Sequence, residues 1–385
     1  METPLLYRQL QDQLRQWVRP KDQRHLQGFS EIVAAILQSK SACLGEWITY
    51  LRHRDCQARA HMERLSYFVH NQQITAERFY EPILRYVLPA FVGESVLLTL
   101  DTSMLWDQFC LIGVCFVWGG RSFAIAQVVL EQGSAMVGFE QYQPVLERAK
   151  QVLPPEVQVT LLADRGFEHA ALVRWLKQQQ WSWAIRVKSD LAVTLTHGQT
   201  RSVEHLTPPP QQAYLYPHVQ VFSDIACHLA TAHPGDAKDT GAVLSDRPPS
   251  LQTFALYGQR FGGIEPHFKD YKSAAFEVLH SGLRNAQALT CLFMLLDCAT
   301  LIALMLGMML VQAGQRAAID WHGERGLSFL QLGLRQLAGL CYQRLPLPSL
   351  TALPKINPSP ACASHKKRTA LDCRIEFSKV ISFSY

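Results

Sequence analysis

The stretch SVLLTLDTSMLWDQFCLIGVCFVW, Ser95–Trp118, predicts two neighbouring strands of a buried sheet. An apolar run of strand length leads to Asp101, and a second β-rich run extends from about Phe109 to Trp118. Long apolar runs without strict alternation are typical of strands that are buried on both faces. We therefore expect Asp101 at or near the end of a buried strand, followed by Thr102 and Ser103.

A second carboxylate stands at the end of another predicted strand. The segment Val157–Phe167 reads VQVTLLADRGF, so Asp164 and Arg165 follow an apolar run. In an open α/β sheet, ligands bind at the carboxyl ends of the strands. Three strands within Val96–Val129 are followed by helix, strand, helix and strand, predicted at Gln141–Val152, Val157–Ala163, His169–Gln179 and Trp181–Lys188.

A third carboxylate, Glu265, lies in the segment Tyr257–Lys272, which reads YGQRFGGIEPHFKDYK. From Glu265 onward the pattern is helical, and one predicted face holds Glu265, Phe268, Lys272, Phe276, Leu279 and Leu283, while Asp270, Tyr271 and Glu277 point away. A carboxylate in the first turn of a helix is favoured by the helix dipole, and Gly262 and Gly263 suit a tight turn before it. Helix capping is the ordinary interpretation of such an acid, and a role in a site is the alternative.

Three motifs in this order resemble the DDE transposases of bacterial insertion sequences. They are Asp-Thr-Ser at 101–103, Asp-Arg-Gly-Phe at 164–167, and Tyr-x2-Arg…Glu-x6-Lys at 257–272. The branch that they resemble has the Tyr-Arg-Glu-Lys signature and a β-rich insertion before the catalytic Glu, as in Tn-five-like transposases. The resemblance covers about Leu97–Gly307. One departure is that four residues separate Arg260 from Glu265, where the family usually has three.

The resemblance implies an α/β fold: a ribonuclease-H-like mixed sheet flanked by helices, with an inserted β subdomain and an N-terminal helical domain. The stretch between Asp164 and Glu265 is too long for a simple loop, which independently favours an insertion. The implied domains are a helical DNA-binding region at 1–95, a catalytic domain at 96–189 and 257–315, a β-rich insertion at 190–256, and a helical, then proline-rich, C-terminal region at 316–385. For residues 1–95, an ordinary helical bundle remains the alternative.

The composition of the chain limits the classes of protein to which it can belong. The chain has 385 residues, 48% of them apolar, which is enough for a sizeable core. A net charge of +5 permits nucleic-acid binding without arguing for it alone. Ten cysteines without metal-type spacing predict reduced thiols, and we expect a cytoplasmic, nucleoid-associated bacterial protein. The apolar run 288–311 is long enough to cross a membrane, but Asp297 near its middle favours a soluble core helix.

The resemblance also assigns roles to individual residues. Asp101, Asp164 and Glu265 would be catalytic and would hold two Mg²⁺ or Mn²⁺ ions, since such ions prefer carboxylate ligands. The remaining candidates would contact DNA: Tyr257, Arg260 and Lys272 through phosphates, Phe261 by stacking on a flipped base, Arg165 beside Asp164, and Arg64 in the N-terminal region. Arg165 also has the alternative of a salt bridge to Glu265.

The function implied is that of a transposase. It would bind the terminal inverted repeats of its element as a homodimer, cleave the DNA ends as an endonuclease, and join them to double-stranded target DNA. Three alternatives stay open: a catalytically inactive relic that only binds DNA, a membrane-associated protein that uses residues 288–311, and a nuclease that does not transpose.

Overall fold

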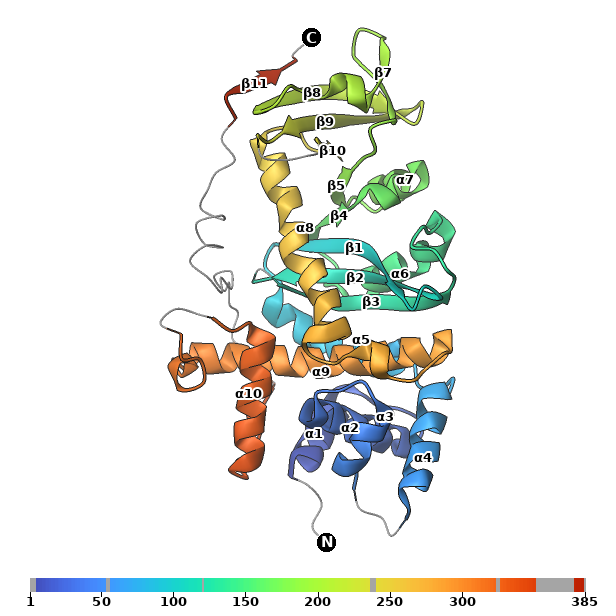
Figure 1. Cartoon of the computed structure of the whole chain (residues 1–385), viewed down its shortest axis with the longest axis vertical. Coiled ribbons are helices and arrows are strands. Elements are labelled where there is room, and N and C mark those ends of the chain that lie inside the picture. The colour runs from blue at the N-terminus through green and yellow to red at the C-terminus, as the bar shows by residue number, and fades with distance from the viewer. Residues whose placement is uncertain are drawn as a thin grey trace.

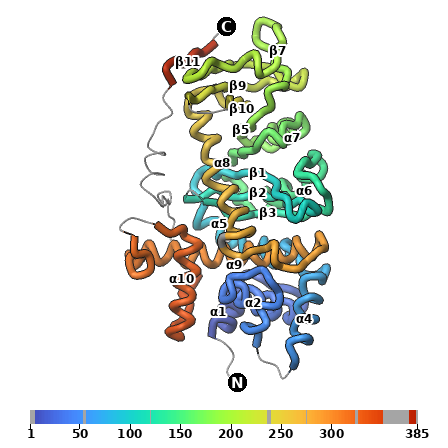
Figure 2. Tube along the Cα trace, in the orientation of Figure 1, coloured from blue at the N-terminus to red at the C-terminus, as the bar shows by residue number. Residues whose placement is uncertain are grey.

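One mixed sheet runs through the protein, with helices against it and a helical region below it (Figures 1 and 2). The structure is a computed structural model and describes residues 5–52, 56–119, 121–235, 240–322, 326–350 and 377–383. Among these residues the strand order is β3-β2-β1-β4-β5-β10-β9-β8-β6-β7, and β11 pairs with β8.

The first five strands form the sheet that the sequence predicts. They are β1 (Ser95–Leu105), β2 (Phe109–Trp118), β3 (Arg121–Glu131), β4 (Gln158–Ala163) and β5 (Ser182–Arg186). The first three are antiparallel neighbours, whereas β4 pairs parallel with β1 and β5 pairs parallel with β4. Helix α6 (Phe139–Val152) lies between β3 and β4 in the chain, and α7 (Ala170–Gln178) lies between β4 and β5. This order and pairing confirm the ribonuclease-H-like α/β fold.

Residues between β5 and the next long helix continue the same sheet. Their strands are β6 (Ala192–Thr194), β7 (Thr200–Ser202), β8 (Gln212–Val221), β9 (Ile225–His233) and β10 (Gly241–Ser245). Strand β10 pairs with β5, so the β-rich stretch extends the sheet at one edge. At the outer part, β11 (Lys379–Ser382) lies parallel to β8, and the Phe383 ring stacks on Tyr216 at 4.6 Å. Residues 351–376, which include most of the predicted proline-rich region, lie outside the described residues.

Helix α8 (Leu251–Lys269) crosses one face of the sheet from β10 towards β3 (Figure 1). It begins at Ser250, whose side chain accepts a hydrogen bond from the Gln252 N–H and caps the helix. The prediction that Glu265 opens this helix is therefore wrong, since Glu265 lies near its C-terminal end. Gly262 and Gly263 also lie inside the helix. A Cβ on Gly263 would come within 3.0 Å of Val117, so this glycine allows α8 to pack closely on β2.

The N-terminal part of the chain is helical. Its helices are α1 (Leu5–Trp17), α2 (Gln23–Ser39), α3 (Leu44–Trp47), α4 (Ala58–His70) and α5 (Ala76–Phe91). Of these, α2, α4 and α5 pack against α9 (Ala286–Gln312), which also contacts β3 and α10 (Phe329–Tyr342). The helical region and the sheet are therefore joined through one long central helix, as the tube in Figure 2 shows.

Helix α9 accounts for the long apolar run of the sequence. Among the described residues it is the one helix long and apolar enough to cross a membrane, and 94% of its most apolar window is buried in the protein. Its single charged residue, Asp297, accepts hydrogen bonds from the Tyr271 hydroxyl and from Gln127 Nε2. Burial raises the pKa of the Asp297 carboxyl well above its usual value. The packing supports the interpretation as a core helix.

Candidate active site

Two of the predicted acids meet at the end of the parallel strands. The parallel pairing of β1 and β4 ends at Leu100 and Ala163, so Asp101 and Asp164 are the next residue on each strand path. Asp101 Oδ1 accepts a hydrogen bond from its neighbour's backbone N–H at 2.9 Å. Asp164 caps a short 3₁₀ turn, and its Oδ1 accepts the Gly166 N–H at 2.8 Å. Strand β1 itself continues to Leu105, so Asp101 lies inside β1 rather than at or near its end, where the sequence predicts it. The end of its parallel pairing with β4 nevertheless brings two carboxylates from distant parts of the sequence together.

Arg260 joins these two carboxylates from α8. Its Nη2 lies 2.7 Å from Asp101 Oδ2 and 3.9 Å from Asp164 Oδ2. Only 5% of the Arg260 side chain is exposed, compared with 37% for Asp164. Its Nε is buried and has no hydrogen-bond partner. The guanidinium is thus paired with carboxylates but has one donor left over.

The pKa of Asp101 is raised to about 6, chiefly because the carboxyl is buried. Arg260 opposes this rise, whereas the negative charges of Asp164 and Glu265 add to it. Three carboxylates therefore act on one another electrostatically at this point of the fold. A divalent cation between them would relieve this repulsion.

Tyr257 lies one turn before Arg260 on α8. Its hydroxyl is buried without a hydrogen-bond partner, and burial raises its pKa to about 12 although Arg260 opposes the rise. The Phe261 ring meets the Tyr257 ring edge-on at 5.8 Å and is 45% exposed. The predicted phosphate-contacting hydroxyl and the predicted stacking ring are thus adjacent, and the ring is open to solvent.

Glu265 has a different place from the one that the sequence predicts. It is exposed, and at about 100° per residue it lies about 140° around α8 from Arg260. Tyr271, expected to point away from the sheet, is 1% exposed and buried. The predicted helix face is therefore wrong. The buried face of α8 is fixed instead by Thr253, Tyr257, Arg260, Gly263, Ile264, His267 and Phe268.

Lys272 and Arg165 are two further residues predicted to contact DNA. Lys272 belongs to a π-helical segment, Asp270–Ala274, that continues α8, and burial lowers its pKa while Asp107 opposes this. Arg165 is exposed directly after Asp164. No ion pair joins Arg165 to Glu265, so the salt-bridge alternative has no support in this structure.

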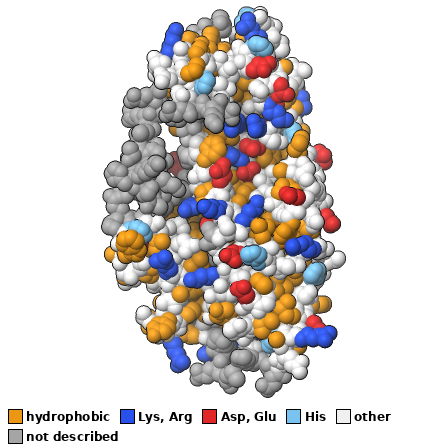
Figure 3. Space-filling model, in the orientation of Figure 1, with side chains coloured by type: hydrophobic (Ala, Val, Ile, Leu, Met, Phe, Trp, Pro, Cys, Tyr) orange, Lys and Arg blue, Asp and Glu red, His pale blue; other side chains and the backbone are white. Residues whose placement is uncertain are grey.

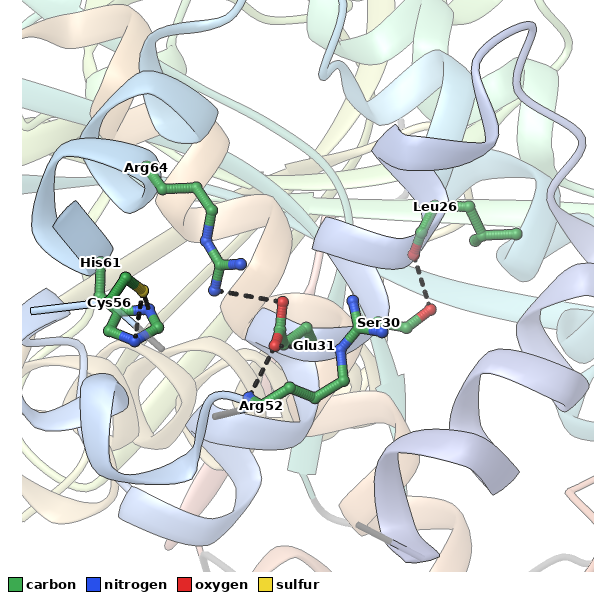
Figure 4. Close-up of polar contacts among 7 residues, drawn as sticks. All are labelled: Leu26, Ser30, Glu31, Arg52, Cys56, His61 and Arg64. Carbon is green, nitrogen blue, oxygen red and sulfur yellow. Dashed lines mark hydrogen bonds and ion pairs between the residues drawn. The ribbon is translucent and has the colours of Figure 1, made fainter. Parts of the chain in front are cut away.

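Arg64 lies away from this site, in a pocket of the N-terminal helices (Figure 4). Its Nη2 is 3.4 Å from Oε2 of Glu31, a carboxylate of α2 that is 5% exposed. Glu31 Oε1 accepts the backbone N–H of Arg52 at 2.8 Å. The pocket has a volume of about 520 Å³ and includes the aromatic Tyr67 and Phe68. Arg64 is thus held by a buried partner, and its role in DNA binding stays a prediction.

Arg186 is a cation of this site that the sequence analysis missed. It ends β5, where Ile185 pairs with Ala163 of β4, so it lies next to Asp164 in the sheet. Its charge opposes the rise that burial causes in the pKa of Tyr257. The side chain is half-buried and has no ion pair with any described residue. A basic residue at the end of the strand beside β4 was the signal that could have identified it.

The donor chemistry of the site fits a divalent cation such as Mg²⁺ or Mn²⁺. Asp101, Asp164 and Glu265 offer carboxylate oxygens only, which are the ligands that these hard ions prefer. Within the described ranges, however, no three acidic, histidine or cysteine side chains are grouped tightly enough to hold one ion. Arg260 is the cation that faces the two aspartates instead.

Comparison with known proteins finds a transposase domain in part of the chain. Residues 114–305 match the family model described as "Transposase DDE domain". The match includes Asp164, Arg186 and all of α8, whereas Asp101 lies before it. No curated protein matches the chain. One solved structure, titled "Cryo-EM structure of piggyBac transposase synaptic complex with hairpin DNA (SNHP)", is similar with a TM-score of 0.45 and 10% sequence identity, over 95% of this chain and 87% of that chain. The family match thus supports a DDE transposase domain over residues 114–305 of this chain.

Proposed function

We propose that the protein is the transposase of a bacterial insertion sequence, which binds the terminal inverted repeats, cleaves the DNA ends and joins them to target DNA. The observation that carries the proposal is the meeting of Asp101 and Asp164 beneath Arg260, where the parallel pairing of β1 and β4 ends. Asp164 and Arg260 belong to the part of the chain that matches the DDE domain. Carboxylates with a cation over them suit chemistry on a phosphodiester.

Asp101, Asp164 and Glu265 would hold two Mg²⁺ or Mn²⁺ ions. When bound, these ions would supply an activated oxygen nucleophile and would neutralise charge at the leaving oxygen. The chain's own contribution is to hold Asp101 by its ion pair with Arg260 and Asp164 by its cap on the Arg165–Phe167 turn. Glu265, on the exposed side of α8, is the least constrained of the three.

The donors around the acids suit a DNA backbone. Arg260 Nε and the Tyr257 hydroxyl are buried donors without an acceptor, and Arg186 is a half-buried cation without an ion pair. A buried donor that lacks an acceptor is costly, and phosphate oxygens would supply acceptors to all three. Phe261, exposed beside Tyr257, is placed to stack on an unpaired base. Lys272 and Arg165 would contact flanking phosphates.

The partners would be double-stranded DNA and a second copy of the chain, in the bacterial cytoplasm on the nucleoid. Figure 3 shows acidic and basic side chains interspersed over the face that carries α8 rather than one continuous basic surface. Contacts that position DNA are therefore expected to be few and specific here, with further contacts from the N-terminal helices and Arg64.

A second candidate function is a relic that binds DNA without cutting it. The exposed position of Glu265, about 140° around the helix from Arg260, is the observation that favours it. The membrane alternative has the burial of α9 against it.

End cleavage distinguishes these possibilities. A duplex with the ends of the element that encodes the protein is incubated with wild-type protein, Asp164→Asn, and the control Asp224→Asn, whose carboxylate pairs with Arg174 on the surface. We expect Mg²⁺-dependent 3′-end cleavage by wild type and control only, while all three bind the ends. Binding without cleavage by the wild type would establish the relic, and cleavage by Asp164→Asn would refute the assigned site.

A further inference from the structure

Arg260 is the counter-ion of the two aspartates in the DNA-free protein. One of its nitrogens contacts Asp101 at 2.7 Å and approaches Asp164 to 3.9 Å, from a side chain that is only 5% exposed. A cation that binds these carboxylates must therefore compete with a buried guanidinium. Such an ion pair raises the free energy needed to bring a second positive charge to the same oxygens.

The guanidinium is not fully satisfied where it lies. Its Nε has no acceptor, and the hydroxyl of Tyr257, one turn away, has none either. A planar guanidinium binds the oxygens of a phosphate through two parallel hydrogen bonds. A phosphate beside Arg260 and Tyr257 would therefore satisfy donors that Asp101 and Asp164 leave unpaired.

We propose that Arg260 couples DNA binding to the loading of divalent cations: it holds Asp101 until a DNA phosphate takes the guanidinium, and only then are both aspartates free to bind metal. This inference rests on the proposed function. The free protein is competent to bind metal only in the fraction of molecules in which Arg260 has left Asp101, so its apparent affinity is reduced by that fraction. Because binding free energies are linked, metal also strengthens DNA binding through the same residue.

Arg186 is a nearby cation that should not couple DNA binding to metal loading. It lies on β5 beside Asp164 but makes no ion pair with either aspartate. Removing it takes away the same charge from the same neighbourhood without freeing a carboxylate. Arg186→Gln is therefore the matched control for Arg260→Gln in the titration without DNA.

The test is Mn²⁺ binding at pH 8, measured by isothermal titration calorimetry on the intact chain with and without a short DNA duplex. The proteins are wild type, Arg260→Gln, Arg186→Gln and Asp164→Asn, each checked by thermal unfolding. Without DNA, Arg260→Gln is expected to bind Mn²⁺ roughly tenfold more tightly than wild type, and Arg186→Gln far less so. With DNA, wild type gains roughly tenfold in affinity and Arg260→Gln gains little.

Each outcome has one meaning. If Arg260→Gln binds Mn²⁺ no better than wild type while Asp164→Asn loses binding, the coupling role of Arg260 is refuted and the metal site stands. If Asp164→Asn binds as wild type does, or if no protein binds Mn²⁺, the metal site itself fails and the inference fails with it. If Arg260→Gln does not fold, equal wild-type affinity with and without DNA refutes the coupling by itself.

Discussion

His267 is a buried histidine that we expect to make this protein sensitive to mild acid. It is 3% exposed, its Nε2 has no hydrogen-bond partner, and the Tyr271 ring lies 4.4 Å away. Burial lowers its pKa from 6.5 to about 3. A histidine whose pKa is lowered by folding contributes stability above its unfolded pKa, and that stability is lost as pH falls towards the folded pKa. The window is therefore pH 6.5 to 3.

The size of the effect follows from the two pKa values. At pH 5.5 the unfolded histidine is mostly protonated and the folded one is neutral, which costs about 1.4 kcal/mol of folding free energy relative to pH 7.5. His267→Leu removes the proton site and keeps a side chain of similar volume. We expect the loss of unfolding free energy between pH 7.5 and 5.5 to be about 1.4 kcal/mol smaller in this variant than in wild type.

Urea unfolding at pH 8.5, 7.5 and 5.5 measures this difference. Between pH 8.5 and 7.5 the two proteins must behave in parallel, because histidine is neutral in both states there. Equal losses from pH 7.5 to 5.5 in wild type and His267→Leu would refute the reasoning. They would mean that His267 can be protonated inside the fold.

Three further predictions concern other parts of the structure. Gly333→Ala would place a Cβ against the Ala303 carbonyl at the crossing of α9 and α10, so we expect the free energy of unfolding, measured by thermal unfolding, to fall by about 3 kcal/mol. Gly339 lies on the same helix with open space around it, so Gly339→Ala should leave this free energy unchanged or raise it by up to about 1 kcal/mol. Tyr257→Phe should stabilise the DNA-free protein by about 1 kcal/mol, because it removes a buried hydroxyl that has no partner, but should weaken DNA binding in a filter assay. Arg186→Gln should weaken DNA binding for all sequences and make its dependence on salt concentration less steep by about one charge, and an unchanged salt slope would show that it touches no phosphate.

The sequence could predict the strands and their acids because apolar runs mark buried strands directly. Asp101 and Asp164 follow such runs, and the parallel pairing that joins their strands is the one that a ribonuclease-H-like fold has. The core position of α9 was also predictable, since one charge in the middle of an apolar run suits a protein interior with partners. The sequence did not show that these partners are Tyr271 and Gln127.

Which face of α8 is buried could not be predicted from Tyr257–Lys272 alone. The helix begins at the Ser250 cap, before that segment, and its buried face is set by packing against β1, β2 and β3. The extra residue between Arg260 and Glu265 then turns Glu265 by about 100° from the position that three intervening residues would give. The ion pair of Arg64 could not be predicted either, because its partner Glu31 lies on another helix and only the packing of the two helices brings them together.

Joining of cleaved ends to a target plasmid tests the central claim most directly. Purified protein, a duplex with the element's cleaved 3′ ends and supercoiled plasmid are incubated with Mg²⁺, and wild type is compared with Asp101→Asn and Glu265→Gln. We predict joined products with wild type alone, while both variants still bind the duplex. Joining by Asp101→Asn at the wild-type rate would contradict the assignment of this site, because Asp101 is the carboxylate that Arg260 holds.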